Sequence, residues 1–289
     1  MSRAEPTASA PERRTPPGAW WRALRSECGL VFGRRRNQAL LAGLCLLPLV
    51  IGVAVKLVSG QMDHGGGADL VSRIAGSGLF LAAVAFVVSM PLFLPLVVSV
   101  VAGDSLAGEA QLGTTRYALI LPVSRTKWLV MKACGLLAFV CAGVLAVLVV
   151  ALVAGFALFG MHGMTLLTGD DLGVGAGVGR IALMAAYVAG SLTGLCAVGL
   201  FVSSLTEMPI AAMAGTAIVP AVSTVLLAVP QLSAIQPGLL TTHWLDLTTF
   251  LFAQPDLGLI RQGLLVQLAW VAVFGTLAWA RVVTADVTA

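Results

Sequence analysis

Charged side chains are scarce in this sequence. Only 10% of the 289 residues are Asp, Glu, Lys or Arg, whereas 58% are hydrophobic and the mean hydropathy is +0.97. A soluble domain carries about 25% charged residues, so this chain has too few to cover a surface that faces water. The composition excludes an ordinary soluble domain and predicts an all-α membrane protein.

The sequence also lacks a phosphate-binding loop. Such a loop needs Gly-Lys followed by Ser or Thr to hold phosphates and magnesium. The lysines, Lys56, Lys127 and Lys132, follow valine, threonine and methionine instead. We therefore expect no ATP or magnesium in this chain. The sequence also offers no well-placed nucleophile, metal cluster or carboxylate pair of the kind that membrane enzymes need, so we expect no other cofactor and no catalytic residues. If ATP powers this protein, a separate partner chain binds and hydrolyses it.

Metal-binding patterns are equally weak. The cysteines form no CxxC pair and mostly fall inside apolar runs, which is typical of small core residues in a helix bundle. His64, His162 and His243 fall on the expected outer side, and Met62 and Met161 adjoin two of them. Imidazole and thioether suit copper, but the histidines are scattered over three loops. We interpret them as ordinary loop residues and expect no metal site.

What the sequence does contain is long apolar runs. A helix needs about 20 mainly apolar residues to cross a bilayer. Thr206 and Glu207 alone separate the fourth and fifth runs, which must form a hairpin with Thr206 as N-cap and Pro209 in the first turn. The six predicted spans are residues 38–59, 78–102, 128–159, 181–205, 208–229 and 262–283.

Ionisable residues are missing from the middles of all six predicted spans. Carriers driven by protons or sodium usually keep carboxylates or histidines there. An ion-coupled carrier is therefore disfavoured, although it stays open because backbone carbonyls can also bind an ion. Lys56 and Lys132 lie near span ends, where we expect their side chains to extend to the interface.

The distribution of basic residues predicts the orientation. With the N-terminus inside, all 17 lysines and arginines except Lys56, Arg73, Arg180 and Arg261 fall on the cytoplasmic side. We therefore expect a multi-pass protein of the plasma (inner) membrane with both termini in the cytoplasm.

The ends of the spans carry three further predictions. Residues 1–18 are charged and rich in proline, which predicts a disordered cytoplasmic tail. Residues 19–37 carry apolar side chains at helical spacing with arginines between them, which predicts an amphipathic interfacial helix on membrane lipids, or else a plain basic flank. Residues 231–260 have no Lys or Arg and two apolar patches, which favours short helices in the outer leaflet over a plain external loop.

The connection between the second and third spans, residues 103–127, is the most informative stretch. Gly108-Glu109 is followed by Gly113-Thr114, then Arg116, then Leu121-Pro122-Val123-Ser124-Arg125. Pro122 ends a short predicted helix over residues 115–121, and Ser124 can cap the next helix. The stretch presents Glu109, Gln111, Arg116 and Tyr117 to the cytoplasm, where they form a lever that a partner could move.

This pattern resembles the coupling-helix region of ABC-2-type transporter permeases, the membrane subunits of ATP-binding-cassette exporters. The match is specific over residues 108–132, and the rest of the resemblance is architectural. It implies a six-span permease domain over residues 38–289, a cytoplasmic ATPase partner carrying ATP and magnesium, a second permease copy as homodimer or heterodimer, and no nucleic acid. Only residues 60–77 lie between the first two spans, which implies the compact version of the family. The residues implied in ATPase coupling are Glu109, Gln111, Thr115, Arg116, Tyr117 and Arg125.

Prolines and glycines inside the spans suggest where helices bend and meet. Pro91, Pro95 and Pro220 remove backbone donors, so we expect the second and fifth spans to hinge and to line the path. Gly190 and Gly194 form a small-xxx-small step that would suit helix association. We interpret the chain as an exporter permease for amphipathic or lipid-like cargo. The alternatives are the ion-coupled carrier and a non-transporting scaffold that docks a cytoplasmic protein.

Overall fold

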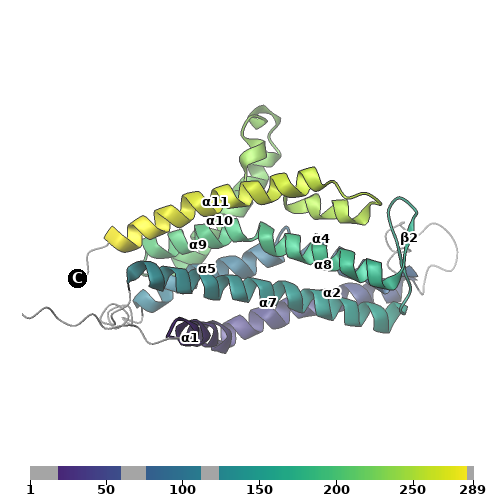
Figure 1. The fold of residues 1–289 in the computed structure, drawn as a ribbon, viewed down its shortest axis with the longest axis horizontal. Coiled ribbons are helices and arrows are strands. Elements are labelled where there is room, and N and C mark those ends of the chain that lie inside the picture. The colour runs from purple at the N-terminus through teal and green to yellow at the C-terminus, as the bar shows by residue number, and fades with distance from the viewer. Residues whose placement is uncertain (1–18, 60–75, 112–123, 285–289) are drawn as a thin grey trace, which may run out of the picture.

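The computed structural model describes residues 19–59, 76–111 and 124–284. Long helices run side by side along the longest axis of this part, and α1 lies across them (Figure 1). The predicted tail, 1–18, and the predicted short helix, 115–121, lie outside the described residues. The helices and strands are α1 (Ala19–Gly33), α2 (Arg35–Ser59), α4 (Gly78–Ser89), α5 (Phe93–Gln111), α7 (Arg125–Phe159), β1 (Met164–Thr165), β2 (Asp171–Leu172), α8 (Val174–Ser191), α9 (Thr193–Leu205), α10 (Pro209–Leu227), η1 (Pro230–Leu232), η2 (Gln236–Gly238), η3 (Trp244–Leu251) and α11 (Leu257–Thr284).

Six helical segments are long and apolar enough to cross a membrane, which confirms the expected number of spans. Helices α8 and α9 together make one of them, with a single break at Leu192. The helical class and the multi-pass architecture follow from length and composition. The spanning segments are Arg35–Ser59, Phe93–Gln111, Arg125–Phe159, Val174–Leu205, Pro209–Leu227 and Leu257–Thr284.

The second predicted span, 78–102, is built differently from expectation. It consists of the short apolar helix α4 and the longer helix α5, with a turn at residues 90–92 between them. Pro91 lies in this turn, where it has no amide hydrogen to continue a helix. Helix α5 then continues to Gln111, well beyond residue 102. Its polar last turns remain helical because they are largely buried against α9 and α10.

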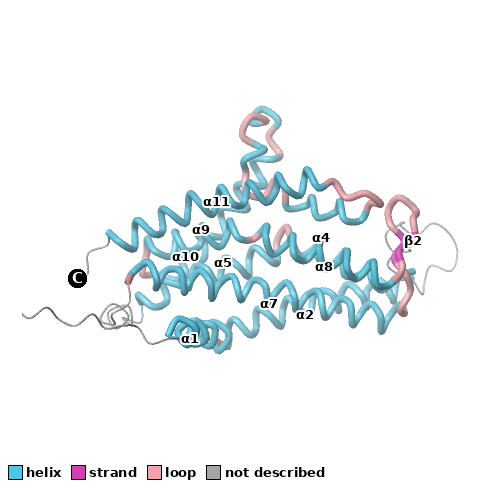
Figure 2. Tube along the Cα trace, in the orientation of Figure 1, coloured by secondary structure: helices cyan, strands magenta, loops and turns pink. Residues whose placement is uncertain are grey.

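The bundle has two ends that differ in chemistry. We call proximal the end at which α2 and α7 begin and α5 and α11 end, and distal the opposite end. The distal end carries the two-stranded antiparallel hairpin of β1 and β2, visible beside the ends of α7 and α8 in Figure 2. Ser124 caps α7 as predicted, since its hydroxyl accepts from the Lys127 amide at 3.4 Å.

Glycines allow two close helix contacts in the core. Gly78 of α4 lies against Gly155 of α7, and a Cβ added to Gly78 would stand 2.4 Å from the Gly155 backbone. Gly103 of α5 lies equally close to α10, where its Cβ would stand 2.6 Å from the Met213 amide nitrogen. No side chain fits at these distances, so these helices pack backbone to backbone.

Helices α5 and α9 are also joined by a buried hydroxyl. Ser203 Oγ accepts hydrogen bonds from the amides of Leu106 and Ala107, at 3.0 and 2.9 Å, and donates to the Gly103 carbonyl at 2.7 Å. The last turns of α5 are therefore attached to α9 through the backbone.

The connection before the last span contains short helices, as the sequence predicts. They are the 3-10 helices η1, η2 and η3, and α11 begins at Leu257 rather than near residue 262. The segment that holds η1 and η2, yellow-green in Figure 1, stands out sideways from the bundle in Figures 1 and 2. The prediction for Thr206 is wrong, because Met208 is the N-cap of α10. Thr206 ends α9 instead, and its hydroxyl accepts from the Met208 amide at 3.1 Å.

Candidate functional site

The proximal end holds a buried cluster of charged side chains around Lys132 of α7. The Lys132 side chain is only 4% exposed, and its Nζ lies 2.8 and 3.0 Å from the two carboxylate oxygens of Glu27 in α1. It also donates to Glu109 near the end of α5. One ammonium group therefore joins three helices.

Local sequence explains how α1 reaches Lys132. Glu27 is the one acidic residue of α1, and it lies over Gly135 of α7, where an added Cβ would stand 2.9 Å from Glu27 Cγ. Phe32 and Phe139 pack nearby with ring centroids 5.5 Å apart. A glycine in α7 and an aromatic pair thus dock α1 so that its carboxylate faces Lys132.

A second group of ion pairs lies beside the first. Arg34, between α1 and α2, and Arg36, in the first turn of α2, both bind Asp104 of α5, and Arg36 does so at 2.6 Å. Asp104 is 10% exposed at its side chain. Asn37 donates to the Val31 carbonyl at 2.8 Å, which ties the end of α1 to the start of α2.

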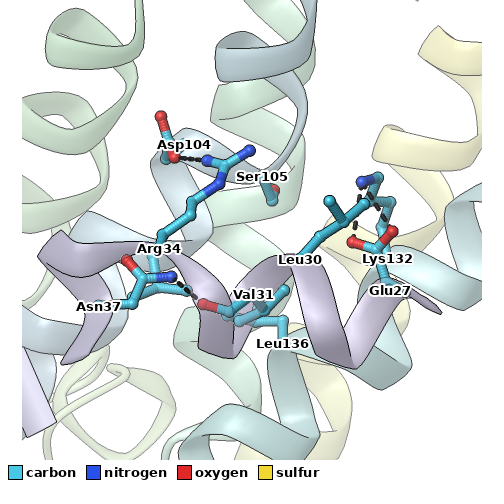
Figure 3. A pocket seen from close by; sticks show the side chains of 10 residues that line it. Glu27, Leu30, Val31, Arg34, Asn37, Asp104, Ser105, Lys132 and Leu136 are labelled. Carbon is cyan, nitrogen blue, oxygen red and sulfur yellow. Dashed lines mark hydrogen bonds and ion pairs between the residues drawn. The ribbon is translucent and has the colours of Figure 1, made fainter. Parts of the chain in front are cut away.

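A small pocket lies between these two groups of ion pairs. Figure 3 shows Arg34 reaching Asp104 on one side and Lys132 meeting Glu27 on the other. We call these residues and Glu109 the proximal charge cluster: Glu27, Arg34, Arg36, Asp104, Glu109 and Lys132.

The electrostatics of this cluster are balanced. It contains three cations and three carboxylates, and each carboxylate has a cationic partner within contact distance. Breaking one buried pair costs about 3–5 kcal/mol because an uncompensated charge is left behind. Through these ion pairs the cluster fixes the relative positions of α1, α2, α5 and α7.

The structure places the predicted coupling residues in two different settings. Glu109 is inside α5 and points inward to Lys132, with 15% of its side chain exposed, whereas Gln111 is exposed at the last residue of α5. Arg125 begins α7 and donates to the carbonyls of Val282 and Val283, at 3.1 and 2.9 Å, in the last turn of α11. The other predicted coupling residues, Thr115, Arg116 and Tyr117, lie outside the described residues.

The predicted hinge residues occupy three different positions. Pro91 is exposed in the turn between α4 and α5, and Pro95 is buried in the first turn of α5. Pro220 is buried within α10, which continues as a helix through it. Because α10 packs along α5, the helices that carry Pro95 and Pro220 are neighbours.

Two sequence expectations about single residues are corrected. Lys132 does not extend to the interface, because two carboxylates hold it in the interior. Gly190 and Gly194 face α11 of the same chain, where Cβ atoms would stand 2.8 Å from Leu264 and 2.4 Å from Gln267. The Gly190–Gly194 pair therefore packs against α11 within the chain and is not available to contact a partner.

Sequence reasoning missed Glu27 and Asp104 as parts of a site. The available signal was their isolation: Glu27 is an acid within a basic helix, and Asp104 follows Gly103 at the end of an apolar run. A charged residue on a helix that has no water-facing side needs an oppositely charged partner on another helix. That partner could not be assigned without the packing of α1, α2 and α7.

Metal ligation has no support within the described ranges. Among residues 19–59, 76–111 and 124–284, no group of three or more His, Cys, Asp or Glu side chains is placed to hold a metal ion. Nδ1 of His162 lies 3.2 Å from the Phe159 carbonyl oxygen, and His243 pairs with Asp246, so the two described histidines lie in separate environments.

The helices and their composition define the class: a multi-pass α-helical membrane protein. Residues 50–283 match a family described as "Protein of unknown function (DUF2705)". Because this match covers more than half of the chain, the chain belongs to that family. No curated protein matches it.

Proposed function

We propose that this chain is the permease subunit of an ATP-driven exporter of amphipathic or lipid-like cargo in the plasma membrane. The observation that carries the proposal is the proximal charge cluster. It surrounds the end of α5 and the start of α7, the two helices between which the resemblance to ABC-2-type permeases implies a coupling helix. Displacement of that connection by an ATPase would reach α1 and α2 through buried ion pairs.

Force would also reach the last span. Arg125 joins the first turn of α7 to the last carbonyls of α11, and Trp279 of α11 donates to Thr126 at 3.0 Å. The helices that flank the implied coupling helix are therefore linked to α11 as well as to α1 and α2. Rigid linkage of this kind converts a local push into movement of whole helices.

A second permease copy fits the exposed surface of α10. Ile210, Ile218, Val222 and Val225 are exposed along one side of this helix. The segment with η1 and η2 that follows stands out from the bundle (Figure 1). Non-helical backbone is tolerated at membrane depth only where protein covers it. In the proposed dimer, α10 and this segment meet the partner permease.

Co-purification tests the proposed function. We expect the chain to bring down a stoichiometric ATPase whose hydrolysis it stimulates, and efflux from vesicles to require ATP. Gln111→Ala, at the exposed end of α5, should weaken that stimulation. Gln262→Ala, equally exposed near the distal end of α11, serves as the matched control and should leave it unchanged.

The alternatives give different results. Transport by the purified chain without nucleotide, abolished when the proton gradient is dissipated, would identify an ion-coupled carrier. A bound cytoplasmic protein without ATPase activity and without transport would identify a scaffold. Either result overturns the proposal.

A further inference from the structure

The exposed side of α1 carries charge of one sign only. Arg22 and Arg25 are exposed, whereas Glu27, the acidic residue of this helix, is turned inward to Lys132. Among the described residues, no carboxylate pairs with Arg22 or Arg25. The positive charge on this side is therefore left uncompensated within the described part of the chain.

The start of α2 extends this positive charge. Arg35 and Arg36 are exposed, and Arg34 keeps 35% of its side chain exposed. Arg34 and Arg36 share one carboxylate oxygen, Asp104 Oδ2. A guanidinium group has five N–H donors, so most donors of these arginines remain available. We call the exposed arginines of α1 and of the start of α2 the basic surface: Arg22, Arg25, Arg34, Arg35 and Arg36.

The basic surface adjoins apolar side chains that are also exposed. Trp20 and Trp21, in the first turn of α1, are 44% and 69% exposed. The membrane-spanning segment of α2 begins at Arg35, and Leu46 and Val50 are exposed farther along it. Tryptophan is enriched where the hydrocarbon of a bilayer meets the headgroups. The basic surface thus lies at the level at which lipid headgroups meet the first span, with α1 lying across the bundle there (Figure 1).

We propose that the basic surface binds the phosphate groups of anionic phospholipids at the proximal side of the membrane. A phosphate accepts paired hydrogen bonds from a guanidinium group, and clustered arginines beside a span attract anionic headgroups. The arginines alone would also suit an acidic protein. The exposed tryptophans and the exposed apolar side of α2 favour a lipid, because both are typical of a surface that meets a bilayer.

Bound lipid would also stabilise the proximal charge cluster. Glu27 of α1 pairs with Lys132 of α7, and Arg34 and Arg36 pair with Asp104 of α5. These arginines can bind Asp104 and a lipid phosphate at the same time, because the two anions use different N–H groups. A ligand that binds only the native state raises the stability of that state. We therefore expect anionic lipid to raise the stability of the folded chain.

Native mass spectrometry of the purified full chain in detergent tests the inference. We would add phosphatidylglycerol or phosphatidylcholine with identical acyl chains and compare how tightly each binds. Phosphatidylglycerol, which has a net negative charge, should bind more tightly than phosphatidylcholine, which has none. It should also raise the unfolding temperature of the chain more than phosphatidylcholine does.

Variants of the arginines without an acidic partner locate the binding. Arg22→Gln, Arg25→Gln and Arg35→Gln leave the ion pairs with Asp104 intact. Each should weaken phosphatidylglycerol binding about fivefold, as expected for one basic residue at an anionic surface. Arg261→Gln, an exposed arginine near the distal end of α11, is the matched control and should leave binding unchanged.

Three results would overturn the inference. Equal binding of the two lipids would mean that α1 rests in the interface without selecting anionic lipid. Unchanged phosphatidylglycerol binding when all three arginines are replaced would place the lipid elsewhere, and loss of a co-purified protein from that variant would assign the basic surface to an acidic partner. Displacement of phosphatidylglycerol by inorganic phosphate at the same concentration would identify a site for the free anion. This inference does not depend on the proposed ATP-driven function.

Discussion

Replacing Lys132 with methionine is the sharpest test of the proximal charge cluster. Lys132, Glu27 and Glu109 have side-chain exposures of 4%, 12% and 15%, so they belong with buried ion pairs and not with surface pairs. The substitution leaves two carboxylates facing each other without a cation. We expect a loss of about 3–5 kcal/mol in the free energy of unfolding.

The design includes a rescue and a control. Adding Glu27→Gln and Glu109→Gln to Lys132→Met removes the unpaired charges and should restore most of the loss, because neutral replacements of buried ion pairs are often tolerated. Lys127→Met, at an exposed position in the first turn of the same helix, should change stability by no more than about 0.5 kcal/mol. Equilibrium unfolding in mixed micelles measures all of these values.

Two results would refute this reasoning. The first is a Lys132→Met variant as stable as Lys127→Met, which would mean that the ammonium does not hold the helices together. The second is that Lys132→Met with Glu27→Gln and Glu109→Gln is no more stable than Lys132→Met alone. The loss of stability would then come from altered packing and not from unpaired charge.

Two further predictions concern the core, and the same unfolding measurement checks them. Gly155→Ala should destabilise by more than about 2 kcal/mol, because its Cβ would stand 2.1 Å from the Gly78 carbonyl oxygen, whereas Gly43→Ala in open space should be neutral or slightly stabilising. Ser203→Ala should cost about 1–3 kcal/mol, because it leaves buried backbone groups of α5 with one partner fewer. Ser204→Ala, whose hydroxyl bonds only within its own turn at Phe201, should cost less.

The sequence predicted those parts of the fold that depend on local apolar content. The spans and the cap at Ser124 follow from run length and from one polar residue before a helix. The extent of α5 did not follow from local sequence. Residues 103–111 have the composition of a polar connection, and they are helical because α9 and α10 bury them. Burial by distant segments, which a local pattern does not contain, decided this boundary.

The candidate site was predictable only in part, for a related reason. Glu109 was predicted to face the cytoplasm and Lys132 to reach the interface, whereas the two side chains pair with each other in the interior. Glu27 was not singled out, since it lies among arginines in a short stretch of basic sequence. Ion pairs between helices depend on how each helix is rotated about its own axis, and the even apolar composition of these spans leaves that rotation undetermined.

The attachment of α5 to α9 has a consequence for biogenesis. Ser203 is 97 residues after Leu106, so the ribosome delivers the hydroxyl long after the amides that need it. Until α9 has been synthesised, the last turns of α5, which carry Asp104 and Glu109, lack the hydrogen bonds to Ser203. The early spans would then insert before their packing is complete, and α5 would take its final position only after α9 has been inserted.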